Sequence, residues 1–185
     1  TANDPRFSTY MGIAQADVYM GWRAESPADA DISHDIDATL HHSDPVAQHV
    51  LTRTSRHDVL SASGERISMN IVSGDHDTMP TAYVEGHAPR TPNEIALPLM
   101  SLSATGYEVG EKIPVDVQGE LKPLTIVGSY QDITNGGKTA KALLDPEPED
   151  VTWYTVLVDL QPGVEPKDVL EEWSHRWPKA NPVAL

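Results

Sequence analysis

A run of histidines and carboxylates at 34–42 carries the most obvious chemistry in this 185-residue chain. It contains His34, Asp35, Asp37, His41 and His42. Imidazole nitrogens and carboxylate oxygens are ligands for zinc and other divalent ions. Their spacing matches no established metal motif, and adjacent side chains such as His41 and His42 diverge in most backbones. We therefore expect a solvated acidic segment, with a metal site at 34–42 kept as the alternative.

Two other acidic patterns are weaker candidates for ion binding. The turn-like sequence Asp75-His76-Asp77 offers three ligand types in a row, but such turns are common without any function. The spacing of Asp29, Asp31, Asp35 and Asp37 is similar to that of a calcium loop. The glycine and the terminal bidentate glutamate of such a loop are missing, so we expect no dedicated calcium site.

Catalytic motifs are not recognisable in the sequence. No G-x-S-x-G elbow is present to expose a serine nucleophile. The sequence Gly136-Gly137-Lys138-Thr139 is similar to the end of a phosphate-binding loop, but position 132 is Asp where the earlier glycine is needed. Trp153, Trp173 and Trp177 have the spacing of core residues more than of a ligand cleft. We expect no catalytic residue and no cofactor.

Composition excludes several classes of partner. The net charge is −15 and the pI is about 4.7, so the chain repels phosphate backbones and we expect no nucleic-acid binding. The same charge disfavours adhesion to an anionic lipid surface. Cysteine is absent, which excludes disulfides, thiolate catalysis and cysteine-based zinc sites.

Hydrophobic patterning and turn residues predict an α+β fold. We expect a first strand at 12–22, a polar loop or acidic hairpin flank at 26–39, and a helix that Ser43-Asp44-Pro45 starts and that ends near Arg53. Exposed connections are expected at 132–140 and 145–150. The other predicted strands are 56–62, 66–73, 95–97, 112–117, 121–130 and 153–160, and the other predicted helices are 98–104 and 167–176.

The order of these elements predicts two lobes. The outer pieces, 1–82 and 133–185, form split strand-helix-strand units that suit an open sheet covered by two helices. The inner piece, 83–132, can close as a small inserted β-rich lobe.

Glycines and a proline in the inner piece have positions with a physical reason. Gly86 and Gly110 suit turns that exclude a Cβ, and Pro89 stiffens the entry to the following loop. Glu94 can accept hydrogen bonds from loop amides or pair with Arg90. Gly128 lets a strand bend or approach a neighbour closely.

This stretch resembles the extracytoplasmic domain of FtsX/MacB-type ABC transporter permeases. The resemblance covers about 45 residues and rests on three motifs. The motif residues are Gly86, Pro89, Arg90, Glu94, Ile95 and Leu97, then Gly106, Tyr107, Gly110, Glu111 and Ile113, then Leu124, Ile126, Val127 and Gly128.

The resemblance implies a location and a set of partners. It implies a porter-like lobe with an inserted small lobe, on the extracytoplasmic side of a cell membrane. Transmembrane helices of the same permease are expected before Thr1 and after Leu185, with an ABC ATPase subunit acting through the membrane. An extracellular protein or an exported substrate is the expected partner outside, and the intact transporter is compatible with a dimer. The alternative is a secreted protein that binds a metal or small ligand through its first third.

Overall fold

The computed structural model describes residues 15–185, which form a mixture of helices and strands as the α+β prediction requires. The chain divides into two compact units, each with its own hydrophobic core. The two-helix unit comprises Ala16–Thr54 and Pro146–Leu185, and the β-rich unit comprises Ser55–Asp145. No helix within residues 15–185 combines the length and hydropathy needed to cross a bilayer.

The two-helix unit is built on a sheet with the strand order β10-β1-β9-β2. Strand β1 (Val18–Arg23) pairs antiparallel with β9 (Val151–Leu160) and with β10 (Val183–Ala184). Buried residues alternate along β1, so one face of the sheet carries the core. The predicted strand at 153–160 is confirmed as β9. The strand predicted at 12–22 corresponds to β1, and its first residues, 12–14, lie outside the described residues.

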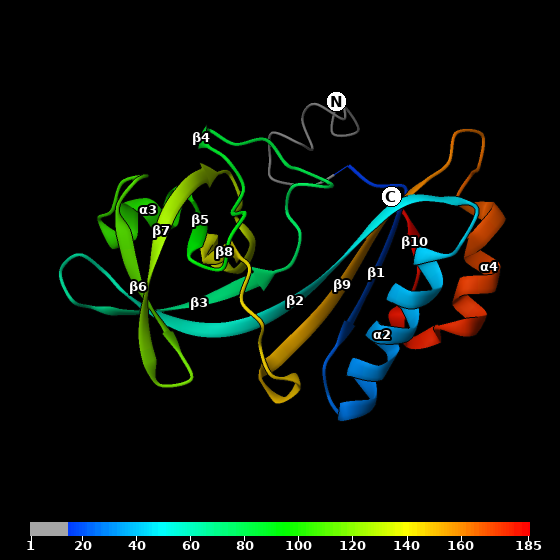
Figure 1. The fold of residues 1–185 in the computed structure, drawn as a ribbon, viewed down its shortest axis with the longest axis horizontal. Helices are drawn as coiled ribbons and strands as arrows, with labels where there is room; N and C mark the ends of the chain where they lie inside the picture. The colour runs from blue at the N-terminus through cyan, green and yellow to red at the C-terminus, as the bar shows by residue number, and fades with distance from the viewer. Residues whose placement is uncertain (1–14) are drawn as a thin grey trace. The chain divides into compact units, whose positions relative to one another are not determined.

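Helices α2 (Pro27–His41) and α4 (Lys167–Arg176) pack on the same face of this sheet (Figure 1). The helix predicted at 167–176 is confirmed. Its apolar residues Val169, Trp173 and Trp177 are 4%, 3% and 4% exposed, as their helical spacing indicates. Two helices therefore cover an open sheet, although one of them is not the helix that the sequence predicted.

The segment 26–39 is helix α2, so the prediction of a polar loop was wrong. Ser26 precedes the helix as its N-cap and Pro27 takes the first position, which is a common helix start. Ser33, Ile36 and Leu40 recur at helical spacing and are buried, while Asp31, Asp35 and Asp37 are exposed. The many aspartates of the solvent face obscured a short apolar stripe.

The segment 43–53 is not a helix, and this prediction was also wrong. It forms a turn, with Val46 N donating to Ser43 O, followed by the long strand β2 (Val46–Leu60). Val46, Val50 and Thr52 are buried β-branched residues that favour a strand. Their spacing also fits a helix, and pairing beside β9 in the sheet decides between the two.

The β-rich unit contains the last residues of β2 and six further strands. Its strand order is β2-β3-β8-β5-β7-β4, and β6 pairs with both β2 and β7. The bounds are β3 (Arg66–Ser73), β4 (Glu85–Gly86), β5 (Glu94–Pro98), β6 (Lys112–Val117), β7 (Glu120–Tyr130) and β8 (Thr139–Ala142). Helix α3 (Leu99–Thr105) follows β5. Met69, Ile71, Ile95, Ile113 and Ile126 are among its fully buried core residues.

Most predictions for this unit are confirmed. The hairpin turns at Ser63-Gly64-Glu65 and Gln118-Gly119-Glu120 join β2 to β3 and β6 to β7. Helix α3 ends at Gly106 in the left-handed conformation, as its position after the helix predicts.

Strand β8 was missed, because residues 139–140 were assigned to the exposed connection 132–140 and residues 141–142 to no element. Ala140 and Ala142 are fully buried, and β8 pairs parallel with β3 and antiparallel with β5. This pairing joins β3 and β8 to the same unit as β5. The boundaries of the β-rich unit therefore fall at 54/55 and 145/146, whereas 1–82, 83–132 and 133–185 were the predicted divisions.

Asp29 anchors the start of α2 to the C-terminal part of the chain. Its carboxylate is 1% exposed, accepts hydrogen bonds from the amides of Glu25 and Ser26, and lies 2.5 Å from Lys179 Nζ. Burial opposes ionisation, but the Lys179 ammonium and the two amides outweigh it and lower the pKa of Asp29. The ionised carboxylate thus stabilises the two-helix unit.

We expect Asp29→Asn to destabilise the protein by roughly 1–2 kcal/mol at pH 7, because the amides of Glu25 and Ser26 and the Lys179 ammonium lose a charged acceptor. A carboxyl with a lowered pKa stabilises above its ordinary pKa of 3.8, and this stabilisation is lost as the pH falls through the folded-state value. The difference from wild type should therefore shrink below pH 4. Urea denaturation at pH 7 and pH 3 measures it, with the exposed Asp31→Asn as control. A difference of the same size at both pH values would contradict this account.

Candidate functional site

Strand β7 brings four of the five predicted motif residues, Gly86, Glu94, Gly110 and Gly128, to one region of the β-rich unit. Gly86 pairs with Gly128 in the β4–β7 register. Glu94 opens β5 and pairs with Thr125 of β7. The amide of Gly110 donates to Ile126 O at 2.8 Å. Residues as far as 42 positions apart in the sequence, Gly86 and Gly128, thus lie on or against one strand.

Gly86 and Gly128 form a crossing at which two main chains approach too closely for side chains. Gly86 has φ +71°, and a Cβ there would overlap the Val127 carbonyl oxygen. A Cβ at Gly128 would overlap the His87 carbonyl oxygen. The amides of Val84 and His87 donate to Ser129 O and Val127 O, on either side of the pair. We refer to this pair as the glycine crossing.

Glu94 closes the turn that leads from the glycine crossing to β5. Its Oε1 accepts hydrogen bonds from the amides of Arg90 and Thr91, at 2.8 and 3.1 Å. The Arg90 guanidinium does not contact Glu94 in these bonds and instead lies 3.2 Å from Asp77. Pro89, one residue earlier, is buried. Glu94 therefore stabilises a loop, which is a structural use of a carboxylate.

Gly110 completes a second turn against β7. It has φ +102°, and nothing lies within 4 Å of the position that a Cβ would occupy. Glu111 supports the same turn, because its Oε1 accepts a hydrogen bond from Glu108 N. Gly110 is thus required for its backbone conformation, whereas Gly86 is required for both conformation and space.

The structure spreads the residues of the alternative metal site at 34–42 along α2 and its C-cap. Asp35 accepts a hydrogen bond from Trp177 Nε1 at 2.8 Å and contacts Arg176. Asp37 contacts His49. Among residues 15–185, no three His, Asp or Glu side chains are grouped so as to hold a metal ion.

The Asp75-His76-Asp77 turn does not present its side chains to an ion. The Asp75 carboxylate accepts hydrogen bonds from the amides of Asp77 and Thr78. His76 points inward, and its Nε2 lies 2.8 Å from Val72 O. Asp77 faces Arg90.

Sequence reasoning missed one serine–histidine pair. His57 Nδ1 lies 2.9 Å from Asp116 O, so Nδ1 donates, and Nε2 lies 2.7 Å from Ser55 Oγ, from which it can accept. This arrangement is similar to that of an activated nucleophile, in which a third group orients a base beside a hydroxyl. Ser55 is fully buried, so a substrate carbonyl cannot reach its hydroxyl. Two residues of one strand at i and i+2 share a face, which is the signal that could have predicted the pair.

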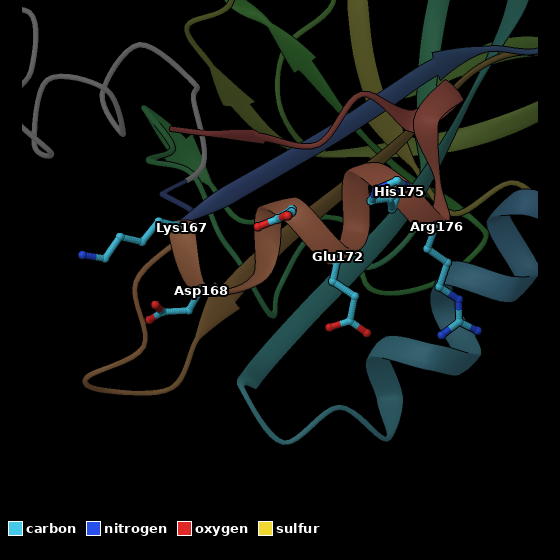
Figure 2. Close-up of a pocket in the computed structure, with 6 residues that line it drawn as sticks. Lys167, Asp168, Glu172, His175 and Arg176 are labelled. Atoms are coloured by element: carbon cyan, nitrogen blue, oxygen red, sulfur yellow. The ribbon is translucent and has the colours of Figure 1, made fainter.

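The outer face of α4 forms a shallow surface hollow (Figure 2). Its lining comes from this one helix. Figure 2 shows Lys167, Asp168 and Glu172 extending outward in different directions, while Arg176 points toward α2. Side chains that diverge in this way form a solvated face and do not create a binding site.

We expect Gly86→Ala to destabilise the protein more than Gly64→Ala. Both glycines have positive φ, but a Cβ at Gly64 would meet nothing within 4 Å. Gly64→Ala should cost about 1–2 kcal/mol for backbone conformation, and Gly86→Ala roughly 1–3 kcal/mol more because the crossing must separate. Chemical denaturation of both variants measures the difference. Equal losses would show that the close approach contributes nothing.

Comparison with known proteins gives similarity in structure but not in sequence. No family model matches the chain, and no curated protein is detectably similar in sequence. The periplasmic region of MacB from Actinobacillus actinomycetemcomitans superposes with a TM-score of 0.60 at 8% identity, covering 93% of this chain and 89% of that one.

Two further solved structures are similar. A domain assigned to a permease protein from Porphyromonas gingivalis has a TM-score of 0.57 at 13% identity, over 90% of this chain and 84% of that one. The extracellular domain of the ABC-type transporter YknZ from Gram-positive bacteria has a TM-score of 0.53 at 12% identity, over 91% and 100%. The predicted resemblance is confirmed: this chain has the fold of the extracytoplasmic domains of MacB-type ABC transporter permeases.

Proposed function

We propose that the chain is the extracytoplasmic domain of an ABC transporter permease and passes ATP-driven movement of transmembrane helices to the outside. The observation that carries this proposal is the fold similarity to three such domains over at least 90% of the chain. The movement would drive export of a substrate or act on an extracellular partner. An ATPase subunit on the other side of the membrane would supply the energy.

The division into two units supports a mechanical role. Each unit has its own core, and within the described residues the chain passes from one unit to the other at 15/16, 54/55 and 145/146. Units that bury their apolar faces separately can move as bodies without unfolding. The glycine crossing and the Glu94 turn stiffen the β-rich unit, because main-chain contacts deform less than long side chains.

A non-enzymatic role is part of the same proposal. Ser55 is the hydroxyl best placed beside a base, and it is fully buried. The five motif residues lie in turns and at a close main-chain contact. The alternative of a secreted metal-binding protein loses support, because the side chains at 34–42 are directed to different partners.

Electron spin resonance on the intact transporter tests the proposal. The 185-residue chain has no cysteine, so single cysteines can be added at will. Labels at the exposed His34 and Lys122 report on the distance between the two units. We expect this distance distribution to change when ATP is bound and hydrolysed.

Labels at His34 and Glu171 provide the matched control, because both positions are exposed and belong to the two-helix unit. This distance should not respond to ATP. An unchanged His34–Lys122 distance throughout the ATPase cycle would argue against coupling through the two units. Failure of the full-length protein to assemble with an ATPase would argue against the permease assignment itself.

A further inference from the structure

The 74–84 segment joins β3 to β4 without regular structure (Figure 1). Main-chain hydrogen bonds to strands hold it at its ends, where Gly74 N donates to Ala142 O and Val84 N donates to Ser129 O. Within the described residues, positions 75–83 make no further main-chain hydrogen bond to a strand. The middle of the segment is therefore held down by side chains.

Lys141 makes the central side-chain contact. It lies on β8 between Ala140 and Ala142, which are fully buried, so alternation directs Lys141 to the opposite face of the sheet. Its Nζ donates to Thr81 Oγ1 at 2.6 Å. The ammonium also lies 4.4 Å from the ring centre of Tyr130 and 5.4 Å from that of Tyr83. Thr81 and Tyr83 belong to the 74–84 segment, so a lysine on the sheet fastens it.

His76, a residue of the 74–84 segment itself, brings a second basic side chain close to Lys141. His76 Nε2 donates to Val72 O, and Val72 is the residue that pairs with Lys141 between β3 and β8. Burial lowers the pKa of His76 to about 4, and the Lys141 ammonium contributes in the same direction. Burial likewise lowers the pKa of Lys141 to about 8. Two groups that carry positive charge in water are thus brought close together and half-buried.

The surrounding charges oppose these shifts only in part. Asp75 attracts a proton to His76, and Asp132 attracts one to Lys141. Asp77 lies against Arg90, which offsets its charge. Burial raises the pKa of Tyr83 to about 12 and that of Tyr130 well above its usual value, so neither ring supplies a negative charge near neutral pH.

We propose that the 74–84 segment is a latch that opens on acidification, because it lies over Lys141 and holds its own His76 beside this lysine, with both side chains half-buried. When the latch is open both groups meet solvent and bind protons more readily. The open form is favoured wherever it binds more protons than the closed form. For His76 this window extends from its ordinary value of 6.5 down to about 4, and for Lys141 from 10.5 down to about 8. Lowering the pH therefore favours opening in both windows.

Hydrogen exchange of the 185-residue chain at pH 5 and pH 7 tests the proposal, after correction for intrinsic exchange rates. The equilibrium constant for opening at 76–83 should rise on the order of tenfold at pH 5, since the His76 window lies between the two values. The amides of β6, β7 and α4 should not follow. His76→Gln keeps an N–H donor for Val72 O but cannot gain a proton, so it should abolish the rise. His34→Gln, at an exposed position of α2, is the matched control and should retain it.

A nuclear magnetic resonance titration of His76 gives an independent readout that needs no opening rate. The ring should stay neutral to about pH 4–5 in the wild type, and Lys141→Met should raise its pKa by removing a neighbouring cation. An ordinary titration near pH 6.5 in the folded protein would overturn the proposal. So would a pH response that persists in His76→Gln, or one that spreads over the whole β-rich unit.

Discussion

The close approach of two main chains at Gly86 and Gly128 is the constraint on which the β-rich unit depends. It places the short strand β4 against the end of β7, and the 74–84 segment and the Glu94 turn both lead into it. A side chain at either glycine would overlap a carbonyl oxygen of the opposite chain. The contact therefore cannot accept a side chain at either glycine. It also fixes where the 74–84 segment ends and where the Glu94 turn begins.

The two units treat buried charge in opposite ways. In the two-helix unit, Asp29 is surrounded by two amides and the Lys179 ammonium, so its charged form is favoured despite burial. In the β-rich unit, Lys141 has one hydroxyl and two aromatic faces, and His76 lies against the main chain of Val72 and Ala142. These contacts stabilise the charged forms less than water does, so the pKa of both groups is lowered. The first arrangement fixes a helix, while the second leaves a segment whose closure depends on pH.

The fold is similar to that of extracytoplasmic permease domains, and the motif residues of this chain have structural contacts. At 8–13% identity the neighbours share an architecture, and function has to be argued from this chain's own residues. The residues that matched the family pattern prove to be turn and crossing residues. The potential metal ligands at 34–42 contact different partners: Asp35 accepts a hydrogen bond from Trp177, and Asp37 contacts His49.

Local signals in the sequence were sufficient where the physical requirement was itself local. Glycines at 106 and 119 predicted a helix end and a hairpin, the aromatic and aliphatic spacing at 169–177 predicted α4, and the motif at 86–128 predicted the fold. Tertiary structure decided the segments whose pattern fits two conformations. Val46, His49 and Val50 fit a helix or a strand, and the neighbouring β9 selects the strand. The contacts of Lys141 could not be predicted from the sequence of its four-residue strand. They are made by Thr81, Tyr83 and Tyr130, which only folding brings to it.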